Sequence, residues 1–435
     1  MGRLADALPP TEEAVTIRRE LGEAKPDRYL PDLAISLNNL GILLAEGGRT
    51  SQALKPSVEA VKIRRDLAAS NPDLYGLYLA RSLTNLAARF SESGRPAEAV
   101  PPAQEAIPIY RELAAVNPSR YSSDLAGSLT TLARSLAEIG RWDEAMPLMQ
   151  EATDIFRELA AASPGRYGPD LAQCLVNLAG ALSEAGHPVE ALPIDLEAVS
   201  AYRELAARMP DRYRPDLARA LGNLGGILSE LGRSADALAP MQEAVTIRYE
   251  LCELSPECHA SDLAHSLANL GVVLWALDRR AEALAAGQQS VSIYRELAET
   301  DSVRHGADFA RSLNNHGIWL AGLGRASEAV SIAQEAVTIY RELAAANPGR
   351  HRPGLAASLA NLCIWYAGLD ASAEALPVAK EWVTTYRELA AADPERYRAG
   401  LAYALTNLAA ILSKLDRSTD AEQIRRDAAG LEGSS

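Results

Sequence analysis

The sequence predicts an all-α solenoid built from one repeated pair of helices. A marker, Ser36-Leu37-Asn38-Asn39-Leu40-Gly41, returns every 46 residues without insertion or deletion. A second marker keeps the same period, from Glu13-Ala14-Val15 to Glu381-Trp382-Val383. A fixed period of this length is typical of one supersecondary unit stacked on its neighbours. We expect nine A-helices and ten B-helices that present a surface and carry out no reaction.

Helix A, the first helix of each copy, is indicated by a single apolar stripe. Apolar residues recur at three- and four-residue steps, which place them on one helical face. In the copy from residue 31 to 75 they are Leu33, Leu37, Leu40 and Leu44. Asp32 stands before this run and can accept from the free N–H groups of a helix start. Gly47-Gly48-Arg49 ends the helix, because glycine tolerates the left-handed conformation there.

Helix B is expected from about Ser51 to Ala69, where Asn71-Pro72 stops it. At about 1.5 Å per residue it is about 29 Å long, and helix A is somewhat shorter. Pro108 lies in the middle of one B-helix and should bend it. Alanine recurs at the position of Ala53, and small residues recur at the position of Gly41, so we expect the two helices to cross closely there.

These residues resemble the signature of the tetratricopeptide repeat family, over practically the whole chain. The matching residues are Asn39-Leu40-Gly41, Leu44, Gly48, Ala53 and Ala60. The usual repeat of that family has about 34 residues, so the longer helix B makes this chain similar to the long-helix, kinesin light chain type. The resemblance implies a right-handed superhelical solenoid, in which the A-helices line a concave groove that binds a protein or peptide.

We expect one solenoid over residues 1–435, with an unpaired helix B at 1–30, stacked repeats at 31–415, and a capping helix and tail at 416–435. In the repeat frame the chain opens in the turn before a helix B, without its partner helix A. Either a neighbouring domain or a second copy, forming a homodimer, could cover that helix.

The bulk composition excludes several classes of function. A formal charge of −14 argues against nucleic-acid binding, which needs clustered Lys and Arg. No apolar run reaches the length of a membrane span, and no secretory signal opens the chain. Four cysteines are too few and too scattered for a disulfide framework. The sequence therefore favours a cytoplasmic protein.

An asparagine recurs on the face of helix A that the resemblance places in the groove. Amides at a fixed pitch can pair with the main chain of an extended peptide. They can also serve local hydrogen bonding within the repeat, and the two roles can coexist. The residues are Asn39, Asn85, Asn177, Asn223, Asn269, Asn315, Asn361 and Asn407, with Thr131 in the third copy.

Further along the same face of helix A, the first five copies carry glutamate, and the residue type at this position then changes. Repeated carboxylates favour a partner with basic segments, although glutamates at helix ends are also ordinary solvated surface. The glutamates are Glu46, Glu92, Glu138, Glu184 and Glu230. The next three copies have small residues there, with Trp275 alongside as an expected pocket wall for an apolar anchor.

The late copies depart most from the repeat. His316 replaces the marker leucine, Trp319 and Trp365 share one position, and Trp382 replaces an alanine. Core filling is the more common role of such residues, and a buried imidazole is more common than a pH switch. Arg311, like the arginines and the histidine at its repeat position, can bind a ligand carboxylate, but we favour pairing with Asp residues of neighbouring copies.

The sequence indicates no enzyme, no cofactor and no metal site. It contains no phosphate loop, zinc-protease helix or nucleophile elbow. Cys252, Cys258, His259 and His265 match no common zinc spacing. The Arg and Glu of the Tyr-Arg-Glu-Leu segments are expected on a solvated outer face. We expect a scaffold or sensor arm that binds a protein or peptide. A self-associating module is the alternative, and a small-molecule or catalytic site in copies six to eight is a remote one.

Overall fold

A computed structural model describes the backbone of residues 2–432 and the side chains of residues 6–431. Nineteen α-helices and no strand are found within residues 2–432, which confirms the all-α repeat and the alternation of nine A-helices with ten B-helices. The A-helices are α2 (Pro26–Glu46), α4 (Pro72–Glu92), α6 (Pro118–Glu138), α8 (Pro164–Glu184), α10 (Pro210–Glu230), α12 (Pro256–Ala276), α14 (Ser302–Gly322), α16 (Pro348–Gly368) and α18 (Pro394–Lys414). The B-helices are α1 (Gly2–Ala24), α3 (Thr50–Ser70), α5 (Pro96–Val116), α7 (Trp142–Ala162), α9 (Pro188–Arg208), α11 (Ser234–Leu254), α13 (Arg280–Thr300), α15 (Ala326–Ala346), α17 (Ser372–Ala392) and α19 (Ser418–Glu432).

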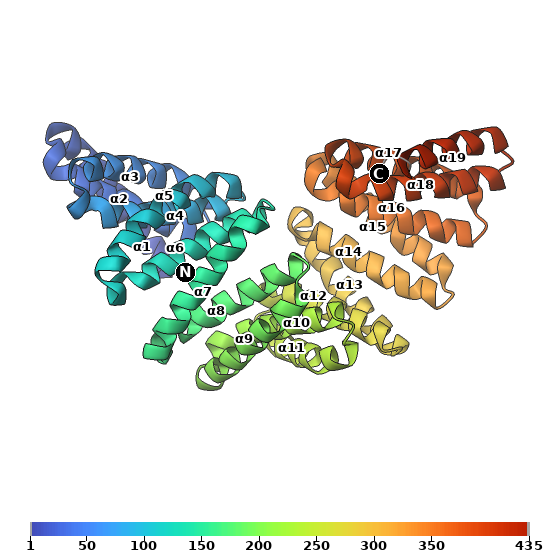
Figure 1. Cartoon of the computed structure of the whole chain (residues 1–435), viewed down its shortest axis with the longest axis horizontal. Helices are drawn as coiled ribbons and strands as arrows, with labels where there is room; N and C mark the ends of the chain where they lie inside the picture. Colours follow the sequence, from blue (N-terminus) through green and yellow to red (C-terminus); the bar gives the residue numbers. More distant parts are fainter. Residues whose placement is uncertain (1, 433–435) are drawn as a thin grey trace. The chain divides into compact units, whose positions relative to one another are not determined.

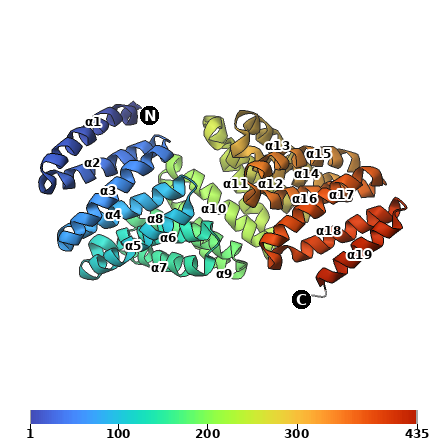
Figure 2. The ribbon, with the colours of Figure 1, turned by 90° about the horizontal axis from the view of Figure 1, so that it is seen from above.

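The chain divides into two compact units, residues 1–213 and 214–435. Within each unit, helices that follow one another in sequence pack side by side. In the first unit α1, α2 and α3 do so, and in the second α17, α18 and α19 do so (Figure 2). The same succession can be followed by colour in each unit of Figure 1.

Helix A begins earlier than the sequence suggested, and a single residue separates it from the preceding helix B. α2 starts at Pro26, so Asp32 lies inside the helix and is not its cap. In the next copy, Asn71 ends α3 and caps α4, with its side-chain oxygen accepting from Leu74 N at 3.1 Å. Proline at the first position needs no N–H partner and has a φ suited to the helix. Helices α2 and α3 therefore have the same length, 21 residues each, where a shorter helix A was expected.

The second turn, from helix A to helix B, requires a left-handed residue. Gly48 adopts φ 75° there, as expected from the sequence. In three of the late copies the residue is aspartate, for example Asp278 with φ 60°. Aspartate is one of the few residues besides glycine that visit this region readily.

Helices A and B of a copy approach closely where the small residues recur. A Cβ added to Gly41 would lie 3.4 Å from the carbonyl oxygen of Ala53 on the facing helix. Ala53 itself is fully buried, as are its equivalents in the other copies. The expected crossing point is therefore present.

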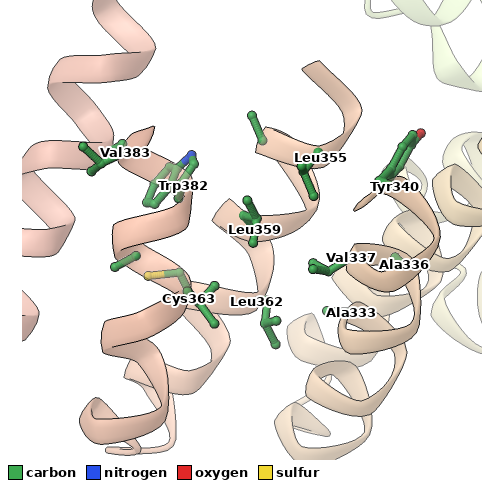
Figure 3. Packing of buried hydrophobic residues seen from close by; sticks show 14 of the residues in the cluster. Ala333, Ala336, Val337, Tyr340, Leu355, Leu359, Leu362, Cys363, Trp382 and Val383 are labelled. Carbon is green, nitrogen blue, oxygen red and sulfur yellow. The ribbon is translucent and has the colours of Figure 1, made fainter. Parts of the chain in front are cut away.

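The core between successive hairpins is filled by interleaved aliphatic and aromatic side chains. Figure 3 shows Leu355, Leu359 and Cys363 of α16 between Val337 on α15 and Trp382 on α17. All five are buried. Helix α16 is thus enclosed by the B-helices before and after it in the chain, α15 and α17.

Successive A-helices also contact one another, at α2–α4, α4–α6, α12–α14 and α14–α16. The A-helices therefore form a layer of their own within each unit. This places the free face of each A-helix next to that of its neighbours, as a shared binding surface requires.

Successive B-helices are connected by ion pairs between solvent-exposed side chains, which agrees with the expected solvated face. The arginine at the repeat position of Arg111, which is the Arg of the Tyr-Arg-Glu-Leu segments where these occur, binds the Glu of the next copy's second marker. The pairs are Arg19–Glu59, Arg65–Glu105, Arg111–Glu151, Arg157–Glu197, Arg295–Glu335 and Arg341–Glu381. Where tyrosine replaces the arginine, at Tyr249, glutamine replaces the glutamate, and Tyr249 Oη donates to Gln289 Oε1 at 2.7 Å.

Helix α5 is continuous through three internal prolines, Pro101, Pro102 and Pro108. The bend expected at Pro108 stays a prediction, as does the right-handed superhelix.

Candidate functional site

One face of each A-helix is left outside the core, and the expected groove residues lie on it. The buried residues of α2 are Leu33, Ala34, Ser36, Leu37, Leu40, Gly41 and Leu44. Ile35, Asn39, Ile42 and Glu46 fall between them at steps of three and four, so they share the opposite stripe. The asparagine and glutamate tracks therefore occupy the same face of the A-helix layer.

The asparagines are mostly half-buried and several form local hydrogen bonds. Asn85 Nδ2 donates to Asn38 Oδ1 of the preceding copy at 3.1 Å, and Asn407 Nδ2 donates to a backbone carbonyl of its own helix at 2.9 Å. Asn177 accepts from Gln173 at 2.8 Å. Local hydrogen bonding thus has direct support, and pairing with a ligand main chain stays a prediction. The same register holds Asn39, Asn223, Asn269, Asn315 and Asn361.

The glutamate track lies at the exposed C-terminal end of the A-helices. Glu46, Glu92, Glu138, Glu184 and Glu230 are each the last residue of their helix. Two of them have basic neighbours, because Arg89 binds Glu92 at 2.9 Å and Arg134 lies 4.0 Å from Glu138. These arginines reduce the negative charge of the A-helix face in the second and third copies.

Three apolar side chains on this face were missed by the sequence reasoning. Val272 is 44% exposed, Ile318 44% and Ile364 40%, and they stand on α12, α14 and α16. These helices contact one another in order, so the three side chains form a stripe across copies six to eight. Their signal in the sequence was an apolar residue at one repeat position in three successive copies, where the three preceding copies have arginine or glycine.

Trp275 is half-buried on α12, one turn from Val272, and the pocket expected beside it for an apolar anchor stays a prediction. Its ring stacks on Trp319, with centroids 6.3 Å apart and planes at 23°. The guanidinium of Arg280 lies 4.7 Å from the centre of the Trp275 ring. A Cβ on Gly322 would lie 2.7 Å from the same ring, so Trp275 occupies the space that this glycine leaves.

His316 belongs to the core and does not line the groove. It is 8% exposed, and its Nδ1 has no hydrogen-bond partner within the described residues. Burial lowers the pKa of His316 below 6.5, and the nearby Arg325 lowers it further. Trp319 and Trp382 are buried as well, which supports the core interpretation of these residues. Trp365 is only half-buried and fills the space beside Gly317.

Arg311 lies on α14, seven residues before Ile318, and belongs to a polar cluster. It binds Asp308 of its own helix at 2.6 Å, and its Nη2 lies 3.5 Å from Nδ1 of His265. Burial lowers the pKa of His265, and the charge of Arg311 adds to the effect. Pairing with a neighbouring copy is found at Arg81, which lies 3.4 Å from Asp124. The arginine–aspartate pairing is therefore right for both, but for Arg311 the partner lies in the same copy.

No group of three potential metal ligands is found in the part of the chain that the structure describes. Cys252 and Cys258 are free cysteines, and Cys258 is exposed. Within residues 2–432, no helix combines the length and apolar character of a membrane span.

Two family models match the repeat directly, and both describe the tetratricopeptide repeat. One matches residues 124–204, and the other matches 79–116, 217–253, 263–303 and 309–347, together more than half of the chain. The chain belongs to the tetratricopeptide repeat family. No curated protein matches it.

Solved structures of low sequence identity share the fold. A Rap protein complexed with Competence and Sporulation Factor is 14% identical over 92% of this chain and 98% of its own, with a TM-score of 0.50. The apo form of the quorum sensor NprR from B. thuringiensis is 12% identical over 90% and 99%, with a TM-score of 0.53. A kinesin light chain with nearly identical TPR-like repeats from Podosopora anserina is 18% identical over 50% and 95%, with a TM-score of 0.39.

Proposed function

We propose that this tetratricopeptide repeat protein is a scaffold or sensor module, which binds a protein or peptide on the free face of its A-helices. The observation that carries the proposal is the apolar stripe of Val272, Ile318 and Ile364 on three A-helices that contact one another. Exposed apolar side chains grouped in this way mark interaction sites more often than isolated ones do.

The polar residues beside the stripe suit an extended peptide segment. Asn269, Asn315 and Asn361 stand one turn away from the apolar residues, on the same three helices. Amides offer both donors and acceptors to a main chain, while the apolar stripe takes side chains. The partner would therefore place apolar side chains on copies six to eight.

The glutamates of the first five copies would favour a partner with a basic segment. They stand at the exposed ends of the A-helices, and like charges in a row favour a cationic segment. A sensor role is part of the proposal because one protein of similar fold is named a quorum sensor and another is complexed with Competence and Sporulation Factor.

Selection of peptides from a random display library on the immobilised chain would test the proposal. Each selected peptide is then titrated against the variants Ile318→Asp and Val189→Asp. Val189 is exposed on the B-helix α9 and serves as the control. Burial of an isoleucine contributes about 1.5–3 kcal/mol, so we expect Ile318→Asp to weaken binding about 10- to 100-fold.

Equal binding by wild type and Ile318→Asp would contradict the proposed face. Light scattering at several protein concentrations tests the alternative of self-association. A strict monomer excludes it, and a dimer that Ile318→Asp dissociates would assign the same face to a second copy.

A further inference from the structure

One position near the start of helix A faces the space between two successive B-helices. At this position a Cβ on Gly306 would lie 3.5 Å from side-chain atoms of Ile339 and Leu343 on α15. The residues that occupy it are Leu30, Gly76, Ser122, Gly168, Arg214, Ala260, Gly306, Arg352 and Arg398.

Two arginines show what chemistry this gap accepts. The Arg352 Nε donates to Glu388 Oε2 at 3.0 Å, and Arg214 forms the same ion pair with Glu250. In both cases the glutamate lies 36 positions later, in the second half of the following helix B. The arginine stem therefore crosses the gap, and its guanidinium binds the carboxylate on the far side.

Gly306 has no side chain to fill this space, and a cavity of about 740 Å³ lies there instead. The equivalent carboxylate, Glu342, lines the cavity, and so does Glu299. Neither glutamate forms an ion pair with any described residue. Phe309, Ile339 and Leu343 provide an apolar floor.

The first unit contains a second example. A cavity of about 560 Å³ lies over Gly76, with Ile109 and Leu113 in its lining. Glu112 lines it at the position equivalent to Glu342, and this carboxylate too forms no ion pair among the described residues. The absence of the arginine and the presence of the open cavity thus occur together twice.

We propose that the cavities over Gly306 and Gly76 bind arginine side chains of a partner polypeptide. The aliphatic stem of arginine packs on apolar surface while its guanidinium stays charged. Its planar donors bind a carboxylate in two-point geometry, which an ammonium cannot reproduce. Three basic side chains also line the cavity over Gly306, namely Arg295, Arg350 and His351. Arg295 is bound to Glu335, so two unpaired glutamates remain beside Arg350 and His351. This site is separate from the A-helix face and does not depend on the function proposed for it.

Methyl NMR on the full chain, titrated with N-acetyl-L-arginine N-methylamide, tests the proposal. The δ1 methyls of Ile339 and Ile109 report on the two cavities independently. We expect both to shift in a saturable way. The citrulline analogue has the same shape without the charge, and it should shift neither.

Gly306→Arg should abolish the Ile339 shifts and leave the Ile109 shifts, because the new side chain fills only one cavity. Gly76→Arg should do the reverse, so each variant is the control of the other. Arg352 occupies this position in the folded chain, and a Cβ at Gly306 meets only ordinary contacts. Glu342→Gln adds no bulk and should weaken the arginine probe at Ile339 about three- to tenfold.

Three results would overturn the proposal. They are equal shifts from the arginine and citrulline probes, Ile339 shifts that persist in Gly306→Arg, and stronger binding of N-acetyl-L-leucine N-methylamide than of the arginine probe.

Discussion

Gly287→Ala is expected to destabilise this protein, although the same change normally stabilises a helix. Gly287 lies inside α13, where replacing glycine by alanine gains about 0.5–1 kcal/mol. Three other copies carry alanine at this repeat position, at Ala103, Ala333 and Ala379. From the repeat alone, alanine would therefore be the better residue.

The surroundings of Gly287 turn the expected gain in stability into a loss. A Cβ there would lie 2.4 Å from Cζ3 of Trp319 and 2.9 Å from Nδ1 of His316. Carbon atoms normally approach to about 3.5–4.0 Å. The ring has little room to retreat, because it already fills the space beside Gly271, where a side chain would otherwise stand. Overpacking of this kind costs about 1–3 kcal/mol, so the net loss should be about 1–2 kcal/mol.

Urea unfolding followed by circular dichroism measures this change. Gly226→Ala is the matched control, because a Cβ at Gly226 meets no atom within 4 Å. It should stabilise by about 0.5–1 kcal/mol. In a Trp319→Val background Gly287→Ala should destabilise less, since the ring is gone and only His316 Nδ1 remains within 3 Å. A gain from Gly287→Ala in the wild-type chain would refute the reasoning.

Two further predictions concern buried and paired groups. The folded-state pKa of His316 is lowered, so the unfolded chain takes up the proton first, and stability falls as pH drops below about 6.5. Urea unfolding at pH 5 to 8 should show that His316→Leu loses less stability than wild type below pH 6.5. The difference in free energy of unfolding between the two proteins should be constant above pH 6.5, and a difference that is constant at every pH would contradict the prediction. Tyr249→Arg with Gln289→Glu restores the common ion pair and should show a favourable coupling of about 0.2–1 kcal/mol in a double-mutant cycle, reduced by salt; additive effects would contradict it.

The period predicted the fold because repetition constrains every copy at once. The spacing of Leu33, Leu37 and Leu40 placed helix A, and the recurrence of Ala53 placed the crossing point. The start of helix A was missed because proline was taken as an end signal only. Pro72 ends one helix by beginning the next, which a rule about single helices does not anticipate.

The site was predicted less well than the fold, because side chains on one helix compete for the same space. Trp275 looked exposed from its position in the repeat, but Trp319 and Arg280 enclose it. Ile318 did not stand out in its own copy, although apolar side chains are exposed at the same position on both neighbouring A-helices. These contacts and shared exposures involve residues of different copies, so they cannot be predicted from the pattern of a single copy.

The ion pairs between B-helices determine which copies can be exchanged. Arg65 of one copy binds Glu105 of the next, and Arg341 binds Glu381 in the same way, so most junctions are chemically equivalent. A whole copy could be duplicated, deleted or moved across such junctions without loss of a partner. The junction spanned by Tyr249 and Gln289 is different, because a neutral hydrogen bond replaces the ion pair there. Lengthening of the array by recombination is therefore open at most junctions and restricted at that one.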